Sequence, residues 1–215
     1  MRRMLPVVAL LTAIGCGGTS PVSPSDIEKG TAGTLNIRLT DNPFDSARAV
    51  LITFSEVSVQ RDGNWSKVPF PDSSAPTWTC DLKKLEGSQD LLATAVFPNT
   101  DFTMVRLIVQ SATVYTDNAS TSPTPCARSI PAPAGSASPM TILASEASTN
   151  GSFSVVGGGS TTILLDFDGE ASITRPNPSA YRLSRAGLTV GPRYLTRRFR
   201  SASRRRGRCP RPRDR

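Results

Sequence analysis

The stretch LNIRLTDNP, residues 35–43, alternates apolar and polar side chains before it reaches an acid and a proline. A period of two is typical of a β-strand that packs one face on a core, so Leu35, Ile37 and Leu39 share a buried face. Asp41 ends the strand. An Asp before a turn usually accepts a hydrogen bond from the N–H two residues on, but residue 43 is a proline without an N–H. Asp41 is therefore either a structural corner with another donor or a ligand for a cation.

The same period recurs along the chain and predicts an all-β fold. Val50, Ile52 and Phe54 share one parity, whereas Val57 and Val59 have the other, so we expect a β-bulge near Ser55-Glu56. Further strands are expected at 91–97, 102–115, 140–143, 152–156, 161–173 and 181–190, with one helical turn at 81–85. About eight strands in this length favour an antiparallel β-sandwich of two packed sheets.

Residues 116–139 interrupt this pattern with small and polar residues and predict a long surface loop. Cys126 lies in the loop and Cys80 lies in the body of the chain. Disulfides form mainly in exported proteins, and the N-terminus described below predicts export. A disulfide between these two cysteines would hold the loop in place. The alternative is two free thiols, because the sequence does not give the distance between them.

The N-terminus, MRRMLPVVALLTAIGC, has a basic start and an apolar run too short to span a bilayer. Its Ala-Ile-Gly-Cys end resembles a lipobox, so residues 1–15 are expected to be a lipoprotein signal peptide and Cys16 the lipidated first mature residue. An ordinary secretory signal is the alternative. Several acyl chains give a stable membrane anchor. Residue 17 is glycine rather than aspartate, which favours the outer membrane or cell surface, with the periplasmic face as the other location. Residues 16–33 form a flexible tether ahead of the domain at 34–190.

The formal net charge of +8 comes from the ends of the chain. Residues 193–215 alone carry eleven Arg and one Asp, so the body is mildly acidic. We expect residues 191–215 to be a disordered basic tail, either a frameshifted end or an arm for acidic polymers, and we expect no nucleic-acid partner for an exported protein. Cys209 in this tail has no evident partner. The sequence contains no His, which excludes His-based triads and His metal ligands.

Asp166 and Asp168 are two residues apart on an expected strand, so their carboxylates leave the same face. They could hold Ca²⁺, with Asp41 as a third ligand, or act as an acid/base pair on a glycan. They could equally be solvated residues at the end of a sheet. Trp65 and Trp78 are either a stacking platform for a ligand or packing residues. Gly157–Gly159 predicts a hairpin turn rather than a phosphate loop, because no Gly-Lys-Ser/Thr ending follows.

Five segments and the region around Trp65 occur in an order that resembles a bacterial lipoprotein family called domain of unknown function 4382. The segments are LTDNPFDSARAVLITFSEVSV (39–59), DLKKL (81–85), FTMVRLIV (102–109), TTILLDFDGEASI (161–173) and YRLSRAGLTV (181–190). The resemblance covers residues 33–190. It implies an exported, lipid-anchored β-domain and brings no established activity with it.

Together these observations predict a lipid-anchored, non-enzymatic β-sandwich that serves as a binding or structural module of the bacterial cell envelope. Its expected partners are the membrane, through the anchor, and an envelope protein or a glycan. No cofactor is expected apart from Ca²⁺ in one alternative. That alternative is a Ca²⁺-stabilised adhesin-like domain, and the other is a carboxylate-dependent glycan hydrolase that uses Asp166 and Asp168.

Overall fold

The computed structural model describes residues 31–42, 46–177, 180–184, 188–191 and 197–198. The expected signal peptide, Cys16, nearly all of the tether, Pro43 and most of the basic tail with Cys209 lie outside the described residues. Within these residues most of the chain is in β-strands, which form two sheets, and almost none of it is helical. The predicted all-β class is therefore confirmed.

The smaller sheet has the order β13-β10-β1-β5, and β14 pairs with β10. Its strands are β1 (Ala32–Asn42), β5 (Asp90–Pro98), β10 (Gly159–Asp168), β13 (Leu188–Val190) and β14 (Arg197–Arg198). The central pair, β1 and β10, runs parallel, and β5 lies antiparallel on the other edge of β1. Strands far apart in the sequence thus form the centre of this sheet.

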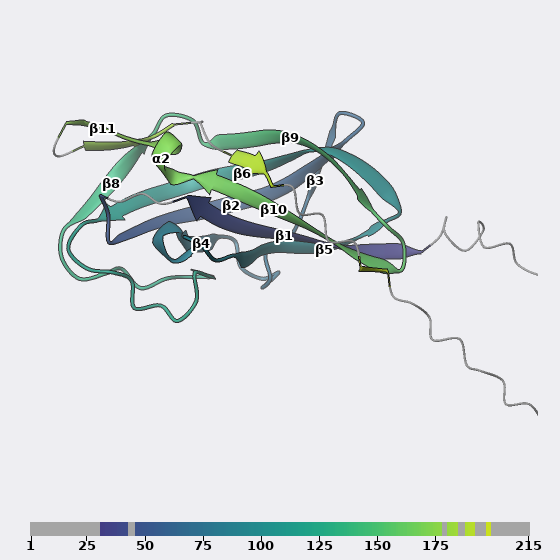
Figure 1. Ribbon diagram of the computed structural model, residues 1–215, viewed down its shortest axis with the longest axis horizontal. Helices are drawn as coiled ribbons and strands as arrows, with labels where there is room; N and C mark the ends of the chain where they lie inside the picture. Colours follow the sequence, from purple (N-terminus) through teal and green to yellow (C-terminus); the bar gives the residue numbers. More distant parts are fainter. Residues whose placement is uncertain (1–30, 43–45, 178–179, 185–187, 192–196, 199–215) are drawn as a thin grey trace, which may run out of the picture.

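The larger sheet has the order β11-β12-β8-β6-β2-β4-β7, with β3 on β2 and β9 on β6. Its strands are β2 (Ala49–Arg61), β3 (Asn64–Lys67), β4 (Trp78–Asp81), β6 (Thr100–Tyr115), β7 (Cys126–Ala127), β8 (Ala137–Ile142), β9 (Glu146–Val155), β11 (Ile173–Asn177) and β12 (Ala180–Leu183). The long antiparallel pair β2–β6 is its centre, and β12 joins β8 in parallel. Figure 1 shows β1 and β10 of the smaller sheet crossing over this pair.

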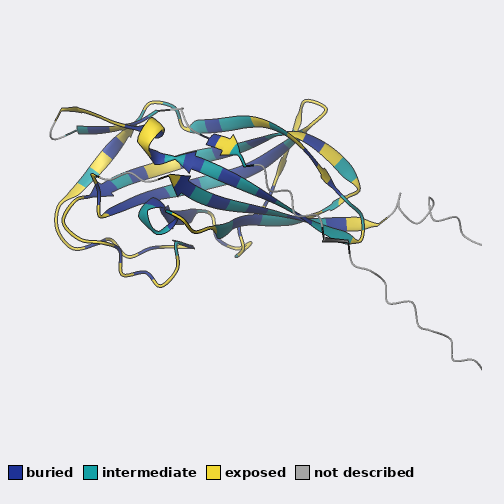
Figure 2. Ribbon diagram, in the orientation of Figure 1, coloured by how far each residue is buried: buried dark blue, intermediate teal, exposed yellow. Residues whose placement is uncertain are grey.

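The core fills the space between the sheets. From the smaller sheet it takes the alternate residues that the sequence predicted, Leu35, Ile37 and Leu39, all fully buried. Phe167 of β10 meets Phe54 of β2 edge to face, with ring centroids 6.5 Å apart. Figure 2 shows the resulting alternation of buried and exposed positions along the strands. A smaller apolar cluster, Ala49, Leu51, Tyr115 and Ile130, lies apart from this core.

The predicted bulge in β2 is confirmed. The register between β2 and β6 shifts on both sides of Phe54, before Glu56. The first shift leaves Gln110 as an extra residue on β6, and the second leaves Ser55 as an extra residue on β2, which returns Val57 and Val59 to the core after Phe54. The turn after β2 also follows the sequence, since Asp62 and Gly63 both have positive φ, the conformation of a tight hairpin.

Other predictions need correction. The sheets are mixed, with two parallel pairings, where purely antiparallel sheets were expected. The segment 161–173 is a strand only to Asp168, because the helical turn α2 (Gly169–Ser172) follows, capped by the Asp168 carboxylate. The segment 181–190 divides into β12 and β13, which lie in different sheets. The turn at Gly157–Gly159 joins β9 of the larger sheet to β10 of the smaller sheet, so it is not a hairpin within one sheet.

The region 116–139 is largely irregular, as predicted, but it contains β7 and the first residues of β8. The predicted helical turn at 81–85 is the 3₁₀-helix η1 (Leu82–Lys84). Among the described residues, no helix has the length and apolar character needed to cross a membrane.

Candidate functional site

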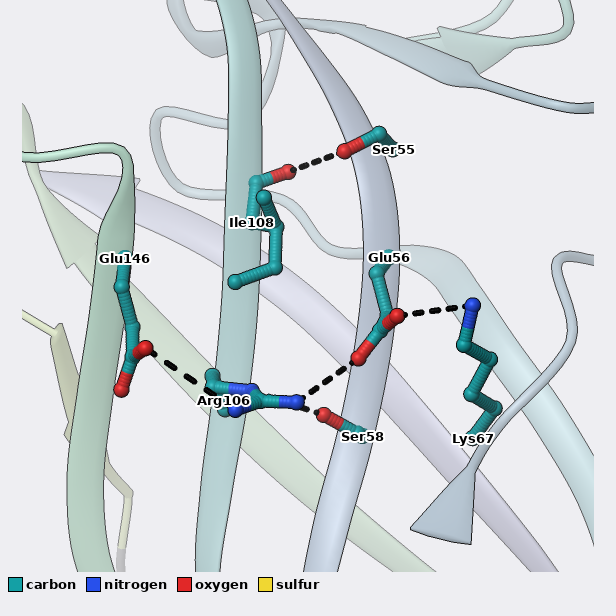
Figure 3. A network of polar contacts seen from close by, with 7 residues as sticks. All are labelled: Ser55, Glu56, Ser58, Lys67, Arg106, Ile108 and Glu146. Atoms are coloured by element: carbon teal, nitrogen blue, oxygen red, sulfur yellow. Dashed lines mark hydrogen bonds and ion pairs between the residues drawn. The ribbon is translucent and has the colours of Figure 1, made fainter. Parts of the chain in front are cut away.

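A charged network occupies one face of the larger sheet, where β2, β6 and β9 lie side by side (Figure 3). Arg106 is its centre. Its Nε donates to Ser58 Oγ at 3.1 Å and its Nη2 donates to Glu56 Oε1 at 2.8 Å. Its Nη1 lies 3.9 Å from Glu146 Oε2. Because Val105 and Leu107 point into the core, the alternation of the strand places Arg106 on the outer face.

The Glu56 carboxylate is held from two sides. Besides Arg106, Lys67 at the end of β3 places its Nζ 2.8 Å from Glu56 Oε2. The side chains of Glu56 and Arg106 are 17% and 20% exposed, whereas that of Lys67 is 77% exposed. The hydrogen bond from Lys67, followed by that from Arg106, lowers the pKa of Glu56 below its usual range despite the burial that opposes this. Glu56 is therefore an anion at neutral pH.

The bulge leaves a gap in the sheet beside this carboxylate. Strand β6 covers one edge of β2 along nearly its whole length, so β3 and β4 both lie on the other edge. There β3 pairs with residues 58–61 and β4 pairs with residues 51–54. Residues 55–57 lie between them, and the backbone N–H of Val68 bonds to the Val57 carbonyl at 2.9 Å as the chain leaves β3.

A pocket of about 260 Å³ opens at this gap. Its walls are mostly apolar, and Glu56 and Lys67 are its charged residues. The lining residues are Ser55, Glu56, Val57, Lys67, Val68, Pro69, Phe70, Ser73, Ala75 and Pro76. Phe70 is in turn stacked on Trp78, with ring centroids 6.0 Å apart, which braces this wall against the core. The pocket thus combines a fixed anion with apolar walls.

The two tryptophans do not form a joint platform. Trp78 pairs with Phe54 across β2–β4 and is buried in the core, where its Nε1 has no hydrogen-bond partner. Trp65 pairs with Gln60 after the bulge and lies on the outer face, where the guanidinium of Arg106 is 4.3 Å from its ring centroid. Trp65 therefore holds Arg106 in place through a cation–π contact, and Trp78 is a packing residue.

The Asp41 carboxylate accepts a hydrogen bond from a residue far along the chain. Its Oδ1 accepts a hydrogen bond from the backbone N–H of Gly169 at 2.9 Å, and its Oδ2 is buried without a partner among the described residues. A side chain at position 169 would crowd this carboxylate, because a Cβ there would lie 3.1 Å from Oδ1. Burial above all, against the opposing Gly169 bond and with smaller contributions from the charges of Glu86, Asp166 and Asp168, raises the pKa of Asp41 to about 8. Asp41 is thus a corner residue that ties β1 to the start of α2.

The other two predicted acids lie near Asp41 but on a different face. In the parallel pair β1–β10, Asp41 stands opposite Phe167 on the core side, so Asp166 and Asp168 point away from the core. Asp168 Oδ1 accepts from the Ala171 N–H and caps α2. Burial and the charge of Asp168 raise the pKa of Asp166. In the part of the chain that the structure describes, no three acidic or cysteine side chains converge on a metal position.

Cys80 and Cys126 form a disulfide, with Cα atoms 4.1 Å apart in the pair β4–β7. The Cys126 N–H donates to Asp90 Oδ2 at 3.0 Å, which links the loop to the edge strand of the smaller sheet. Asp81, next to Cys80, accepts from the N–H groups of Val50 and Lys83. The disulfide segment is therefore connected to both sheets.

Sequence reasoning missed Glu56, Arg106, Lys67 and the pocket. The signal for Glu56 was available, because the predicted bulge at Ser55-Glu56 marks an irregular edge, and bulges often re-aim a side chain at such places. No local signal pairs Glu56 with Arg106, which is fifty residues away in the sequence. The buried acid Asp81 was within reach of sequence reasoning, because Asp is a preferred residue ahead of a helical turn.

The protein is thus an all-β sandwich whose larger sheet carries the Arg106 charged network on its outer face and a small pocket at the gap between β3 and β4. The chain belongs to the family described as domain of unknown function (DUF4382), whose model matches residues 32–184. The resemblance noted in the sequence is thereby confirmed as family membership. No curated protein and no solved structure matches the chain significantly.

Proposed function

We propose that this protein is an exported, lipid-anchored β-sandwich that acts as a binding module of the bacterial cell envelope. The observation that carries the proposal is the pocket at the β3–β4 gap, with the Glu56 carboxylate at its edge. Ligand sites in proteins are concave and mostly apolar, with a few placed polar groups, and this pocket has that composition.

Export is supported by two features of the cysteines. Cys16 follows a short apolar segment in a sequence that resembles a lipobox. Cys80 and Cys126 are joined in a disulfide, and disulfides persist mainly outside the reducing cytosol. The anchor would hold the domain at the outer membrane or cell surface, with the pocket available to a neighbouring envelope component.

The glycan hydrolase alternative draws support from one property, the raised pKa of Asp166, which suits a general acid. Its presumed partner Asp168 is engaged with the backbone of α2. Neither acid lines the pocket. The geometry therefore favours binding over hydrolysis. A glycan panel with turnover that Asp168→Asn abolishes would reverse this preference.

The binding function is tested by photo-crosslinking in the living bacterium. A photoreactive amino acid replaces Ser73, which is exposed at the rim of the pocket, or Val96, which is 67% exposed on β5 of the other sheet. We expect a discrete crosslinked species from position 73 and none of that size from position 96. The same pattern from both positions, or no product from either, would contradict a binding role for the pocket.

A further inference from the structure

The pocket already receives a cation from the chain itself. Lys67 lines the pocket, and its ammonium group contacts Glu56 Oε2 at 2.8 Å. A carboxylate has about four acceptor positions on its two oxygens. Arg106 occupies one on Oε1 from the sheet face, so Oε2 is the oxygen that a second cation uses (Figure 3).

Of the two cations on Glu56, only Lys67 is free to leave. Arg106 is fixed by Ser58, by Glu146 and by the Trp65 ring as well as by Glu56. Among the described residues Lys67 forms an ion pair with Glu56 and with no other acid, and its side chain is 77% exposed. Because the Lys67 side chain is largely in solvent, its pair with the partly buried Glu56 contributes on the order of 1 kcal/mol, so another ammonium group can replace Lys67 at little cost.

The dimensions of the pocket limit the ligand. A volume of about 260 Å³ is below the range of about 300–1,000 Å³ typical of small-molecule sites, and it suits one side chain. Val57, Val68, Phe70, Ala75 and Pro76 offer an apolar surface to an alkyl stem. A side chain with an apolar stem and a terminal ammonium group matches both the walls and the anion.

We propose that the pocket binds a lysine side chain of a partner protein, whose ammonium group replaces that of Lys67 on Glu56. The inference rests on the proposed binding function and adds the chemistry of the ligand. Lys67 acts as an internal competitor that keeps Glu56 neutralised while the pocket is empty. Removal of Lys67 should therefore strengthen binding of a cation and would weaken binding of an anion.

The experiment measures binding of Nα-acetyl-lysine N-methylamide to the full mature chain by NMR titration. Its matched probe is the Nε-acetylated form, which keeps the stem and lacks the charge. We expect the charged probe to bind with a dissociation constant of roughly 1 mM, since few atoms make contact, and the acetylated probe to bind at least about tenfold more weakly. Equal binding of the two probes would overturn the proposal.

Three variants make the test specific. Lys67→Met should tighten binding of the charged probe by up to about fivefold, the equivalent of one exposed ion pair. Glu56→Gln should abolish it, with circular dichroism as the check on folding. Glu146→Gln is the control, because Glu146 contacts Arg106 without lining the pocket, and it should leave binding unchanged. Weaker binding in Lys67→Met would contradict the proposal even if Glu56→Gln fails to fold.

The outcome is separable from that of the proposed function. If the charged probe does not bind but crosslinks still form from position 73, the lysine assignment fails and the binding module stands. If the charged probe does not bind and no crosslinks form from position 73, both the lysine assignment and the proposed binding function fail.

Discussion

Asp41 is a carboxylic acid whose pKa folding raises to about 8, so we expect it to be mostly protonated at neutral pH. Its carboxyl is buried at the junction of β1 and α2, near Glu86, Asp166 and Asp168, and among the described residues it accepts one hydrogen bond, from Gly169. A buried carboxylate without a cation favours its neutral form, because burial removes the water that stabilises the charge. Raising the pH should therefore destabilise the native state, because it ionises the buried Asp41 carboxyl.

The first prediction concerns the pH dependence of stability. The pKa of Asp41 is about 8 in the native state and near 3.8 when exposed, so between these values the native chain holds a proton that the unfolded chain has lost. The free energy of unfolding should fall with rising pH by up to about 1.4 kcal/mol per unit through this acid. Asp41→Asn removes the titration, so its stability relative to wild type should rise from pH 4 to pH 8 in urea denaturation.

The control is Asp117→Asn, whose stability relative to wild type should stay nearly constant from pH 4 to pH 8 and should rise only as the pH falls below the exposed value of 3.8. The backbone N–H of Ser136 donates to Asp117 at 2.7 Å and lowers the pKa of this exposed acid. The stability that Asp117 contributes is fully present above its pKa in the unfolded chain, and it is lost as the pH falls through its lower pKa in the native state. A stability difference between Asp41→Asn and wild type that stays constant from pH 4 to pH 8 would show that Asp41 is ionised in the native protein.

The second prediction concerns calcium. Asp41 lies on the core face of the smaller sheet, whereas Asp166 and Asp168 lie on the other face, and calcium needs six or more oxygen ligands. We expect the melting temperature of the mature chain to be the same in EDTA and in millimolar Ca²⁺. A rise of several degrees on addition of Ca²⁺, lost in Asp166→Asn, would restore the adhesin-like alternative.

At the scale of elements, the β2 bulge generates the candidate site. It returns Val57 and Val59 to the core, and it separates the part of β2 paired with β3 from the part paired with β4. The change of parity in the sequence predicted the bulge, because buried apolar residues report the strand face directly. The gap was not predictable from the bulge alone, since it also depends on where β4, a strand of four residues, begins and ends.

The third prediction concerns the disulfide, which joins residues 46 apart in the sequence. Closing a loop of this length restricts the unfolded chain, so the double variant Cys80→Ser/Cys126→Ser should lose about 3–4 kcal/mol in urea denaturation. Cys209→Ser is the matched control and should retain wild-type stability. A loss below about 1 kcal/mol in the double variant would mean that the segment is held by the β4–β7 pairing and the Asp90 bond without the disulfide.

At the scale of the molecule, sequence periodicity predicted the all-β class and the main core strands but not their order. The reason is physical. Alternation shows which face of a strand is buried, whereas the choice of neighbour depends on contacts between distant segments. The parallel pairing of β1 with β10 brings Asp41 to Gly169, 128 residues away, so the sequence could show that Asp41 needed a donor without naming it.

The fourth prediction concerns the place of the protein in the cell. If Cys16 carries the lipid, its acyl chains hold the mature protein on a membrane, because two or more chains give stable anchoring where one does not. Cys16→Ala should abolish labelling by radioactive palmitate and move the protein from the membrane fraction to the soluble or precursor fraction. Cys209→Ser, which removes a thiol without touching the expected lipobox, should label as wild type does. Equal labelling of Cys16→Ala and wild type would refute the anchor. The domain that the structure describes begins at Thr31 and does not include Cys16, so this result would leave the pocket and its ligand to be tested separately.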